Sequence, residues 1–462
     1  MIVRSKLSSV DDVGAVYIDK FRVIRTINPA FEGFANKLLK SGLIDKLVEQ
    51  GLFPKTWVSD FDFEGNNLIL EHEKVEVTTY PYEWSPEMLR RAAICTLKVA
   101  EVASEYGYQL KDAQPYNIIY SNKGPIFVDF GSFVEVDNAK GWLAIYEFYT
   151  SFYFPLKIYE IGFREIFSKI FIKNGQGVSA HEYLCIKYPI IGLVGIGKLQ
   201  RLVRGYYFLR RIAIDSKFKT NRINPAMQSI LAGLTGPFFR GNDYLLLTKK
   251  INQIHFHAKT QWGDYHQESG LINESGEISL TDRFKTVLDI LKEVRPCSVL
   301  ELACNQGVLS NEISRLDFVR QVICTDYDEI AIDKLVKRFS DQNVKLAPAI
   351  LDFVKPLGNL RTDSPIMRFQ SDMVIALAVT HHLILTQKIS INVILDSLFG
   401  YSKQYVLVEF MPLGLWDGNT ALPIPSWYTP EWFEAHLRKY ASIEKVIHYS
   451  TNRILYFCNK KN

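Results

Sequence analysis

The sequence lacks the features that define several large classes of protein. Its six cysteines include no Cys-x-x-Cys pair and no zinc-type spacing, so neither a zinc site nor a disulfide framework is expected, and the pattern suits a reducing compartment. The net charge of +4 is too small to indicate a nucleic-acid or membrane partner by itself.

Long hydrophobic runs are also scarce. The first residues contain no apolar core of a signal peptide, and the longest mostly apolar stretch, 189–197, has about half the length of a membrane span. We therefore expect a cytoplasmic protein. The chain has 462 residues, of which 47% are hydrophobic and 23% charged, which is typical of a folded protein of two or three domains.

From Pro296 onward, short apolar runs alternate with helical patterns. This alternation predicts an α/β fold with a doubly wound parallel sheet covered by helices on both faces. The last two apolar runs, 442–450 and 452–460, predict a closing antiparallel hairpin. The other expected strands of this sheet are 297–303, 321–327, 344–353, 372–379 and 405–410.

The first half of the chain has a different, α+β pattern. Two glycines and a proline in 234–244 indicate a boundary, which gives predicted domains at 1–245 and 246–462. Strand-like and helical patterns alternate irregularly before it: strands at 16–27 and 57–80, helices at 29–50 and 86–106, a hairpin at 117–130 and a mostly helical, aromatic stretch at 142–232.

Three acidic residues lie at the ends of expected strands of the second half, at the sheet edge where ligands bind. Glu301 begins a turn that ends at Gly307, and this turn is not the Gly-x-Gly-x-x-Gly of a dinucleotide site. Its carboxylate suits a cationic ligand group. Asp326, about 20 residues beyond Gly307, can accept both hydroxyls of a ribose, and Asp352 can reach an adenine edge.

These segments resemble a known family. VLELACNQGVLS followed by VICTDYD is similar to the first two motifs of class I S-adenosylmethionine-dependent methyltransferases, and ILDF and DMVIALAVTHHL are similar to later ones. The resemblance covers about 165 residues and implies a Rossmann-like, seven-stranded domain that binds S-adenosylmethionine. A Rossmann-like domain that binds another nucleotide, or none, is the alternative. The implied cofactor residues are Glu301, Ala303, Asn305, Gly307, Asp326, Tyr327, Asp352 and Ala376; Asn305 stands where the family often has glycine.

The methyl acceptor is expected over the end of the fourth strand. His381 or His382 could deprotonate a hydroxyl there, or could cap a helix or pack on the sheet, and Glu409 is a second candidate base. No Asn-Pro-Pro-Tyr tetrapeptide follows this strand, which disfavours amino acceptors on nucleic acid. We expect O-methylation of a glycan, glycolipid or small molecule. The polar and aromatic segment 259–265 either covers the cofactor or is an amphipathic connector.

In the first half, Asp112 is followed by Asn117 and, after the predicted hairpin, by Asp129 in an Asp-Phe-Gly sequence. This spacing resembles the catalytic and metal loops of the protein-kinase-like fold. The resemblance implies that Asp112 positions an acceptor hydroxyl and that Asn117 and Asp129 hold Mg²⁺ for ATP.

The kinase-like pattern is incomplete. No histidine precedes Asp112, no glycine-rich loop is visible, and Arg22 or Arg25 would have to replace the ATP-binding lysine, with Glu32 as its partner. Three interpretations stay open: a degenerate kinase fold with a structural or substrate-binding role, an active small-molecule or glycan kinase, or a chance resemblance.

The whole chain, with a kinase-like half before a methyltransferase-like half, also resembles a bacterial group related to nodulation and surface-polysaccharide proteins. This resemblance implies a glycan or glycolipid acceptor. A bifunctional kinase–methyltransferase and a non-catalytic S-adenosylmethionine-binding scaffold remain alternatives. The basic run 198–222, with interleaved aromatics, could hold an anionic acceptor such as a phosphorylated glycan, could bind RNA or lie peripherally on a membrane surface, or could be a solvated helix face.

Overall fold

The computed structural model describes most of the chain. The basic run 198–222 and nearly all of 234–244 lie outside the described residues. No helix in the described part is both long and apolar enough to cross a bilayer. The described residues are 2–10, 12–19, 21–61, 63, 65, 67–121, 124–136, 141–172, 177–187, 243–260, 262–268, 270–272, 278–339, 345–358, 362–416 and 423–461.

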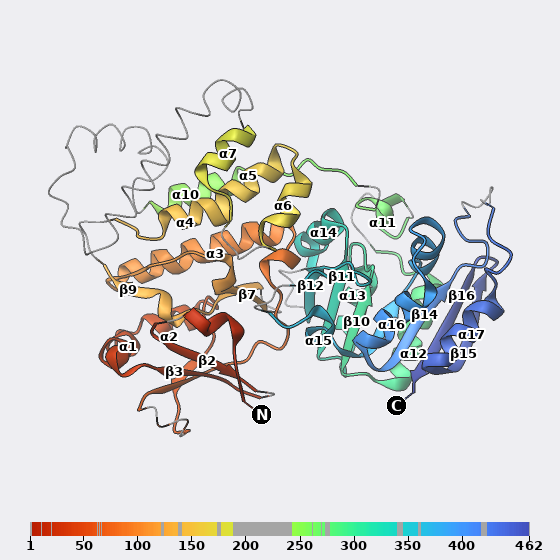
Figure 1. Ribbon diagram of the computed structural model, residues 1–462, viewed down its shortest axis with the longest axis horizontal. Coiled ribbons are helices and arrows are strands. Elements are labelled where there is room, and N and C mark those ends of the chain that lie inside the picture. Colours follow the sequence, from red (N-terminus) through yellow and green to blue (C-terminus); the bar gives the residue numbers. More distant parts are fainter. Residues whose placement is uncertain are drawn as a thin grey trace. The chain divides into compact units, whose positions relative to one another are not determined.

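Two compact units alternate along the chain (Figure 1). The first contains Met1–Glu73, Leu89–Ile118 and Ile126–His257, and the second contains Lys74–Met88, Ile119–Pro125 and Ala258–Asn462. This division differs from the single boundary after residue 245 that the sequence predicts. Helix α10 (Tyr244–Asn252) belongs to the first unit, and two short segments of the first half belong to the second.

An antiparallel sheet of order β1-β2-β3-β5-β4 forms part of the first unit. The strands expected within 16–27 are separated by a tight turn at Asp19, whose carboxylate accepts the N–H groups of Phe21 and Arg22 at 2.7 and 2.6 Å. The strands are β1 (Val3–Arg4), β2 (Gly14–Ile18), β3 (Val23–Ile27), β4 (Thr56–Val58) and β5 (Ile69–His72).

Helices make up most of the remainder of the first unit. The expected helix at 29–50 is two helices, because Gly42 adopts a φ of +81° that ends the first one. Helix α3 begins at Pro86 in the second unit and continues into the first. The elements are α1 (Glu32–Lys40), α2 (Leu43–Glu49), α3 (Pro86–Glu105), α4 (Ile145–Phe148), α5 (Phe154–Glu160), α6 (Arg164–Ile170) and α7 (Ala180–Lys187), with β6 (Tyr108–Leu110) paired to β9 (Phe133–Glu135). The strands β7 (Ile118–Ser121) and β8 (Gly124–Phe127) also pair, and most of this hairpin belongs to the second unit, which contains Ile119–Pro125.

A seven-stranded sheet of order β12-β11-β10-β13-β14-β16-β15 forms the core of the second unit. The strands β10 to β14 run parallel, and β16 is antiparallel to both β14 and β15, as the closing hairpin predicts. The strands are β10 (Ser298–Leu302), β11 (Gln321–Asp326), β12 (Leu346–Ile350), β13 (Ser371–Ala376), β14 (Ser402–Phe410), β15 (Ala441–Ser450) and β16 (Arg453–Lys460).

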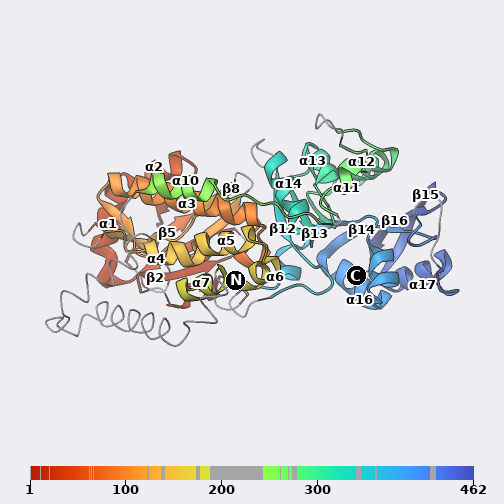
Figure 2. The same ribbon diagram turned by 90° about the horizontal axis from the view of Figure 1, so that it is seen from above.

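Helices cover both faces of this sheet (Figure 2). The parallel strands are buried on both faces; Val299, Leu300 and Val374, for example, are fully buried. Because the order reverses on either side of β10, the carboxyl ends of β10, β11 and β13 surround a switch point where a ligand can bind. The helices are α11 (Tyr265–Glu268), α12 (Asp282–Val294), α13 (Val308–Ser314), α14 (Glu329–Phe339), α15 (Pro365–Arg368), α16 (Ile391–Tyr401) and α17 (Pro430–Tyr440).

Candidate functional site

The turn between β10 and α13 has an unusual backbone. Ala303, Asn305 and Gly307 adopt φ angles of 54°, 51° and 68° in the left-handed region, where residues other than glycine are uncommon. Alternating left-handed residues turn the chain sharply at the end of the strand. Such strain is characteristic of ligand-binding loops, and all three residues belong to the predicted cofactor set.

The conformation and contacts of Asn305 explain why asparagine can stand where glycine is more usual. Asparagine tolerates the left-handed conformation better than most residues, and here its side chain also forms two hydrogen bonds. Its Oδ1 accepts the N–H of Gln306 at 2.9 Å, and its Nδ2 donates to the carbonyl of Trp262 at 2.7 Å. Gln306 adds a second link, from its side-chain nitrogen to the carbonyl of Gly263 at 2.8 Å. The turn is therefore tied to the segment 259–265.

Asp326, at the end of β11, lies directly beside this turn. Its carboxylate accepts the N–H of Asn305 at 2.8 Å and the N–H of Asp328 at 2.9 Å. Burial raises the pKa of Asp326 to about 6, although both backbone hydrogen bonds act in the opposite direction. A carboxylate held in this way at a strand end can accept hydroxyl donors from a sugar.

Glu301 is buried next to the turn, at 5% exposure. Burial raises its pKa to about 7, while the Ser310 hydroxyl, which donates to its Oε2, and the nearby charge of Arg283 lower the pKa. A carboxyl group with this pKa is only partly ionised near neutral pH. A cationic ligand group would favour the ionised form.

Gly307 has no space for a side chain. A Cβ at this position would lie 2.4 Å from Cδ1 of Leu335, which is fully buried, and the φ of +68° disfavours any other residue. We expect Gly307→Ala to lower the free energy of unfolding by about 1–3 kcal/mol and to weaken ligand binding at the turn. Urea unfolding measures this. Gly358→Ala, where a Cβ meets nothing within 4 Å, is the control; equal effects of the two changes would contradict the prediction.

The segment 259–265 contributes an aromatic wall. The ring of Trp262 lies 4.8 Å from the ring of His382 in an edge contact, and its indole is a hydrogen-bond partner of the Tyr327 hydroxyl. Trp262 therefore links residues that follow β10, β11 and β13. Tyr327 is 58% exposed, so its ring remains available to a ligand. These contacts favour the covering role for the segment over that of a simple connector.

The two candidate histidines differ in their surroundings. His381 is buried, and burial together with the neighbouring His382 and Arg453 lowers its pKa to about 3. Burial also lowers the pKa of His382, which remains half-buried beside Trp262. Both imidazoles are neutral at pH 7. His381 is the weaker proton acceptor of the two, and His382 is the more accessible one.

Glu409, at the end of β14, is part of an ion-pair group. Its side chain is fully buried; Arg453 donates to its Oε2 at 2.8 Å, and Nε of Arg283 lies 3.6 Å from its Oε1. A carboxylate that is fully buried and paired with two guanidinium groups is not exposed to an acceptor, so its surroundings disfavour the role of base. The sequence gives no signal for Arg283 or Arg453. Only the pairing of β14 with β16 brings Arg453 to Glu409.

The remaining two predicted cofactor residues lie at the same edge of the sheet. Asp352 follows β12, is exposed, and its Oδ1 accepts the N–H groups of Val354 and Lys355 at 3.1 and 3.0 Å. Ala376 ends β13 and is fully buried beside Leu302. The structure thus places all eight residues at the carboxyl ends of four neighbouring strands.

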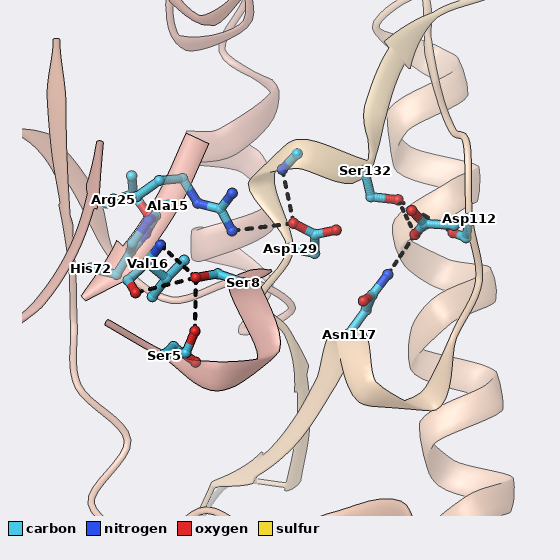
Figure 3. A network of polar contacts seen from close by, with 12 residues as sticks. Ser5, Ser8, Ala15, Val16, Arg25, His72, Asp112, Asn117, Asp129 and Ser132 are labelled. Carbon is cyan, nitrogen blue, oxygen red and sulfur yellow. Dashed lines mark hydrogen bonds and ion pairs between the residues drawn. The ribbon is translucent and has the colours of Figure 1, made fainter. Parts of the chain in front are cut away.

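A second polar cluster lies in the first unit (Figure 3). Asp112 accepts hydrogen bonds from Asn117 at 2.5 Å and from the Ser132 hydroxyl at 2.7 Å, and burial raises its pKa. Asp129 pairs with Arg25 of β3 at 3.2 Å and accepts the N–H of Gly131 at 3.0 Å. Of the two arginines that could replace the ATP-binding lysine of the kinase-like pattern, it is therefore Arg25, and not Arg22, that pairs with Asp129.

This cluster does not favour Mg²⁺. Asn117, one of the two predicted ligands, donates to the Asp112 carboxylate, so its side-chain amide is engaged within the cluster. The guanidinium of Arg25 already neutralises the Asp129 carboxylate that a magnesium ion would need.

Comparisons with known proteins give partial similarities. No protein-family model matches the sequence. The nodulation protein NoeA of Rhizobium meliloti (strain 1021) is 22% identical over 427 residues, which cover 87% of this chain and 83% of NoeA.

Two solved structures are similar to part of the chain. The N-methyltransferase NodS of Bradyrhizobium japonicum WM9 is 13% identical, with a TM-score of 0.30, and the match covers 39% of this chain and 96% of NodS. An S-adenosylmethionine-dependent methyltransferase of Clostridium acetobutylicum ATCC 824 is 10% identical, with a TM-score of 0.32, covering 43% of this chain and 96% of that one. Both TM-scores are below 0.5, so the cofactor is inferred below from the side chains of the site.

Proposed function

We propose that this chain is an S-adenosylmethionine-dependent methyltransferase that methylates a hydroxyl group of a glycan, glycolipid or small-molecule acceptor. One observation carries the proposal: the strained turn 303–307 and the Asp326 carboxylate are joined by the N–H of Asn305 at the ends of β10 and β11. This arrangement offers a carboxylate to a ribose and close backbone approach to the rest of a nucleoside, without the glycines that a pyrophosphate needs.

The chain's residues fit the parts of this cofactor. S-adenosylmethionine supplies an electrophilic methyl group on its sulfonium. Asp326 would accept the ribose hydroxyls, and the buried Glu301 would face the cationic end. Trp262 and Tyr327 would cover the bound nucleoside, because the hydrogen bonds from Asn305 and Gln306 hold the 259–265 segment against the turn.

For the acceptor, His382 is the better placed of the two histidines. It lies beside Trp262 and keeps partial exposure, whereas His381 is buried behind it with ring centroids 4.1 Å apart. His382 would accept the acceptor's hydroxyl proton as a neutral imidazole. Most of the rate enhancement would come from positioning the hydroxyl in line with the methyl group. The glycan acceptor follows from the resemblance of the sequence to the nodulation and surface-polysaccharide group, and the partial similarity to a nodulation protein is in keeping with that group.

Cofactor binding is expected to depend on pH. The pKa of Asp326 is raised to about 6 and that of Glu301 to about 7, so both carboxyls gain protons as the pH falls through these values. Each loses the negative charge that attracts the ligand, and the affinity for S-adenosylhomocysteine should fall below about pH 7 and more steeply below about pH 6. Calorimetric titrations across this range measure the change. Glu301→Gln should remove the upper step, and a flat profile in the wild type would contradict the assignment.

Calorimetry with S-adenosylhomocysteine, and separately with ATP plus Mg²⁺, tests the proposed function. Binding of the first ligand supports the methyltransferase, and its failure to bind the wild type would overturn the proposal. Binding of ATP that is lost in Asp129→Ala would indicate a nucleotide site in the first unit, and phosphoryl transfer that is lost in the same variant would indicate a second activity. Transfer of a labelled methyl group to acceptor extracts separates an enzyme from a scaffold that only binds the cofactor.

A further inference from the structure

An excess of positive charge lies at the carboxyl end of β14. The carboxylate of Glu409 contacts Arg453 with one oxygen and Arg283 with the other, at 2.8 and 3.6 Å. Two guanidinium groups thus share one carboxylate, and the group formed by Arg283, Glu409 and Arg453 has a net charge of +1. The charge of Arg283 also acts on Glu301, but burial raises the pKa of that carboxyl to about 7, so it offsets the surplus only in part at neutral pH. A partly buried surplus charge is unfavourable unless a further anion neutralises it.

The burial of the three side chains indicates a fixed arrangement. Glu409 is 0% exposed, while Arg283 and Arg453 keep 20% and 26% of their side chains exposed. The buried carboxylate therefore pairs with both arginines, and each arginine keeps part of its side chain exposed. A guanidinium group has five donors in a planar fork, which suits carboxylate and phosphate oxygens.

The neighbouring His381 is a second sign of a missing ligand. It is 95% buried (5% exposed), and its Nδ1 has no hydrogen-bond partner among the described residues. Buried polar atoms in native proteins are nearly always paired. Because Arg453 contributes to the lowered pKa of His381, the two side chains are close enough to interact. His381 follows β13, on the side of the sheet edge where the acceptor is expected.

The position of the group relative to the strands distinguishes it from the cofactor site. The turn 303–307 follows β10, whereas Glu409 ends β14, two strands along the sheet, and Arg453 begins β16, three strands along. Neighbouring strands are about 4.8 Å apart, so Arg453 lies about 10 Å or more from the turn across the sheet. Arg283 is nearer to the cofactor side, since its charge influences Glu301.

We propose that Arg453 and Arg283, anchored by Glu409, bind an anionic oxygen group, a carboxylate or a phosphate, of the methyl acceptor. The inference rests on the proposed function and narrows its substrate class to acidic acceptors. The bound anion neutralises the surplus charge and holds the acceptor while its hydroxyl approaches His382.

Inorganic phosphate and glucuronate serve as probes for the two kinds of anion. Each is titrated calorimetrically into the protein with and without saturating S-adenosylhomocysteine. We expect binding that Arg453→Gln weakens by about tenfold or more, since a charge-assisted hydrogen bond is lost. Glu409→Gln should tighten binding, because it raises the net charge of the group. Arg438→Gln, which removes an exposed guanidinium on α17, should leave binding unchanged.

Binding of neither probe to the wild type, or equal binding to the wild type and Arg453→Gln, would overturn the proposal. Retained S-adenosylhomocysteine affinity shows that Arg453→Gln is folded. If this variant fails to fold, the tighter binding expected for Glu409→Gln carries the test.

The arginines could instead bind the carboxylate of the cofactor itself. This alternative is tested by comparing the affinities for S-adenosylhomocysteine and for 5′-methylthioadenosine, which lacks the carboxylate. If Arg453→Gln abolishes the preference for S-adenosylhomocysteine, the group binds the cofactor's own carboxylate and the proposal is wrong. A wild type that binds the anions but no S-adenosylhomocysteine would instead contradict the methyltransferase assignment.

Discussion

Replacing Asp326 with alanine is expected to weaken S-adenosylhomocysteine binding by about a hundredfold or more. The ionised carboxylate would accept two ribose hydroxyls, and each charge-assisted hydrogen bond contributes about 1.5–3 kcal/mol. The change also leaves the N–H groups of Asn305 and Asp328 without the acceptor that now holds the turn beside β11. Calorimetric titration of the variant against the wild type measures the loss.

Two controls separate ligand contact from loss of structure. Asp326→Asn keeps the shape and one acceptor oxygen, so it should bind more tightly than the alanine variant. Asp129→Ala removes a carboxylate of the first unit and should leave S-adenosylhomocysteine affinity unchanged. An alanine variant at 326 that binds within about threefold of the wild type would show that this carboxylate does not hold the nucleoside.

The second large effect is expected at a buried ion pair within the second unit. Glu83 and Arg368 pair with side-chain exposures of 2% and 9%, and Arg368 also donates to the carbonyl of Thr78 at 2.5 Å and lies over the ring of Tyr80 at 4.7 Å. Arg368→Ala leaves Glu83 buried and uncompensated. We expect the free energy of unfolding of this unit to fall by about 3–5 kcal/mol, measured by urea unfolding followed through S-adenosylhomocysteine binding.

Removing both charges together should cost much less. The double variant Glu83→Gln/Arg368→Met keeps similar volumes without a buried charge, and such replacements are often close to neutral. Arg438→Ala breaks an exposed pair with Glu434 on α17 and should change stability by about 1 kcal/mol or less. Similar losses for Arg368→Ala and Arg438→Ala would mean that the Glu83–Arg368 pair is not buried in solution.

The sequence predicts the second unit's sheet well because its signals are local. The strands β10 to β14 are short apolar runs bounded by turns, and the residues that line a ligand lie at the ends of these runs. Asp326 could be identified from its distance to Gly307. The role of Asn305 could not, because its partner, the carbonyl of Trp262, lies 43 residues away and is brought close only by the folded chain.

Long-range ion pairs account for most of what the sequence does not reveal. Glu409 has the residue type and strand position of a base, yet its function is decided by Arg453, 44 residues away, and by Arg283 on a helix that precedes the sheet. Glu83 and Arg368 are 285 residues apart. Charged residues at such separations carry no periodicity, so neither pair could be inferred before the fold was known.

The alternation of the two units along the chain limits where related sequences can recombine. The second unit is a discontinuous piece of sequence, because 74–88 and 119–125 belong to it although they lie within the first half. A single recombination event near residue 245 would transmit Arg368 without Glu83, and Asp333 without Glu87, whose N–H it accepts at 2.9 Å. A relative that acquires a new C-terminal part by recombination should therefore inherit these two short segments with it. Otherwise, its acceptor specificity should change through point substitutions at the edge of the sheet.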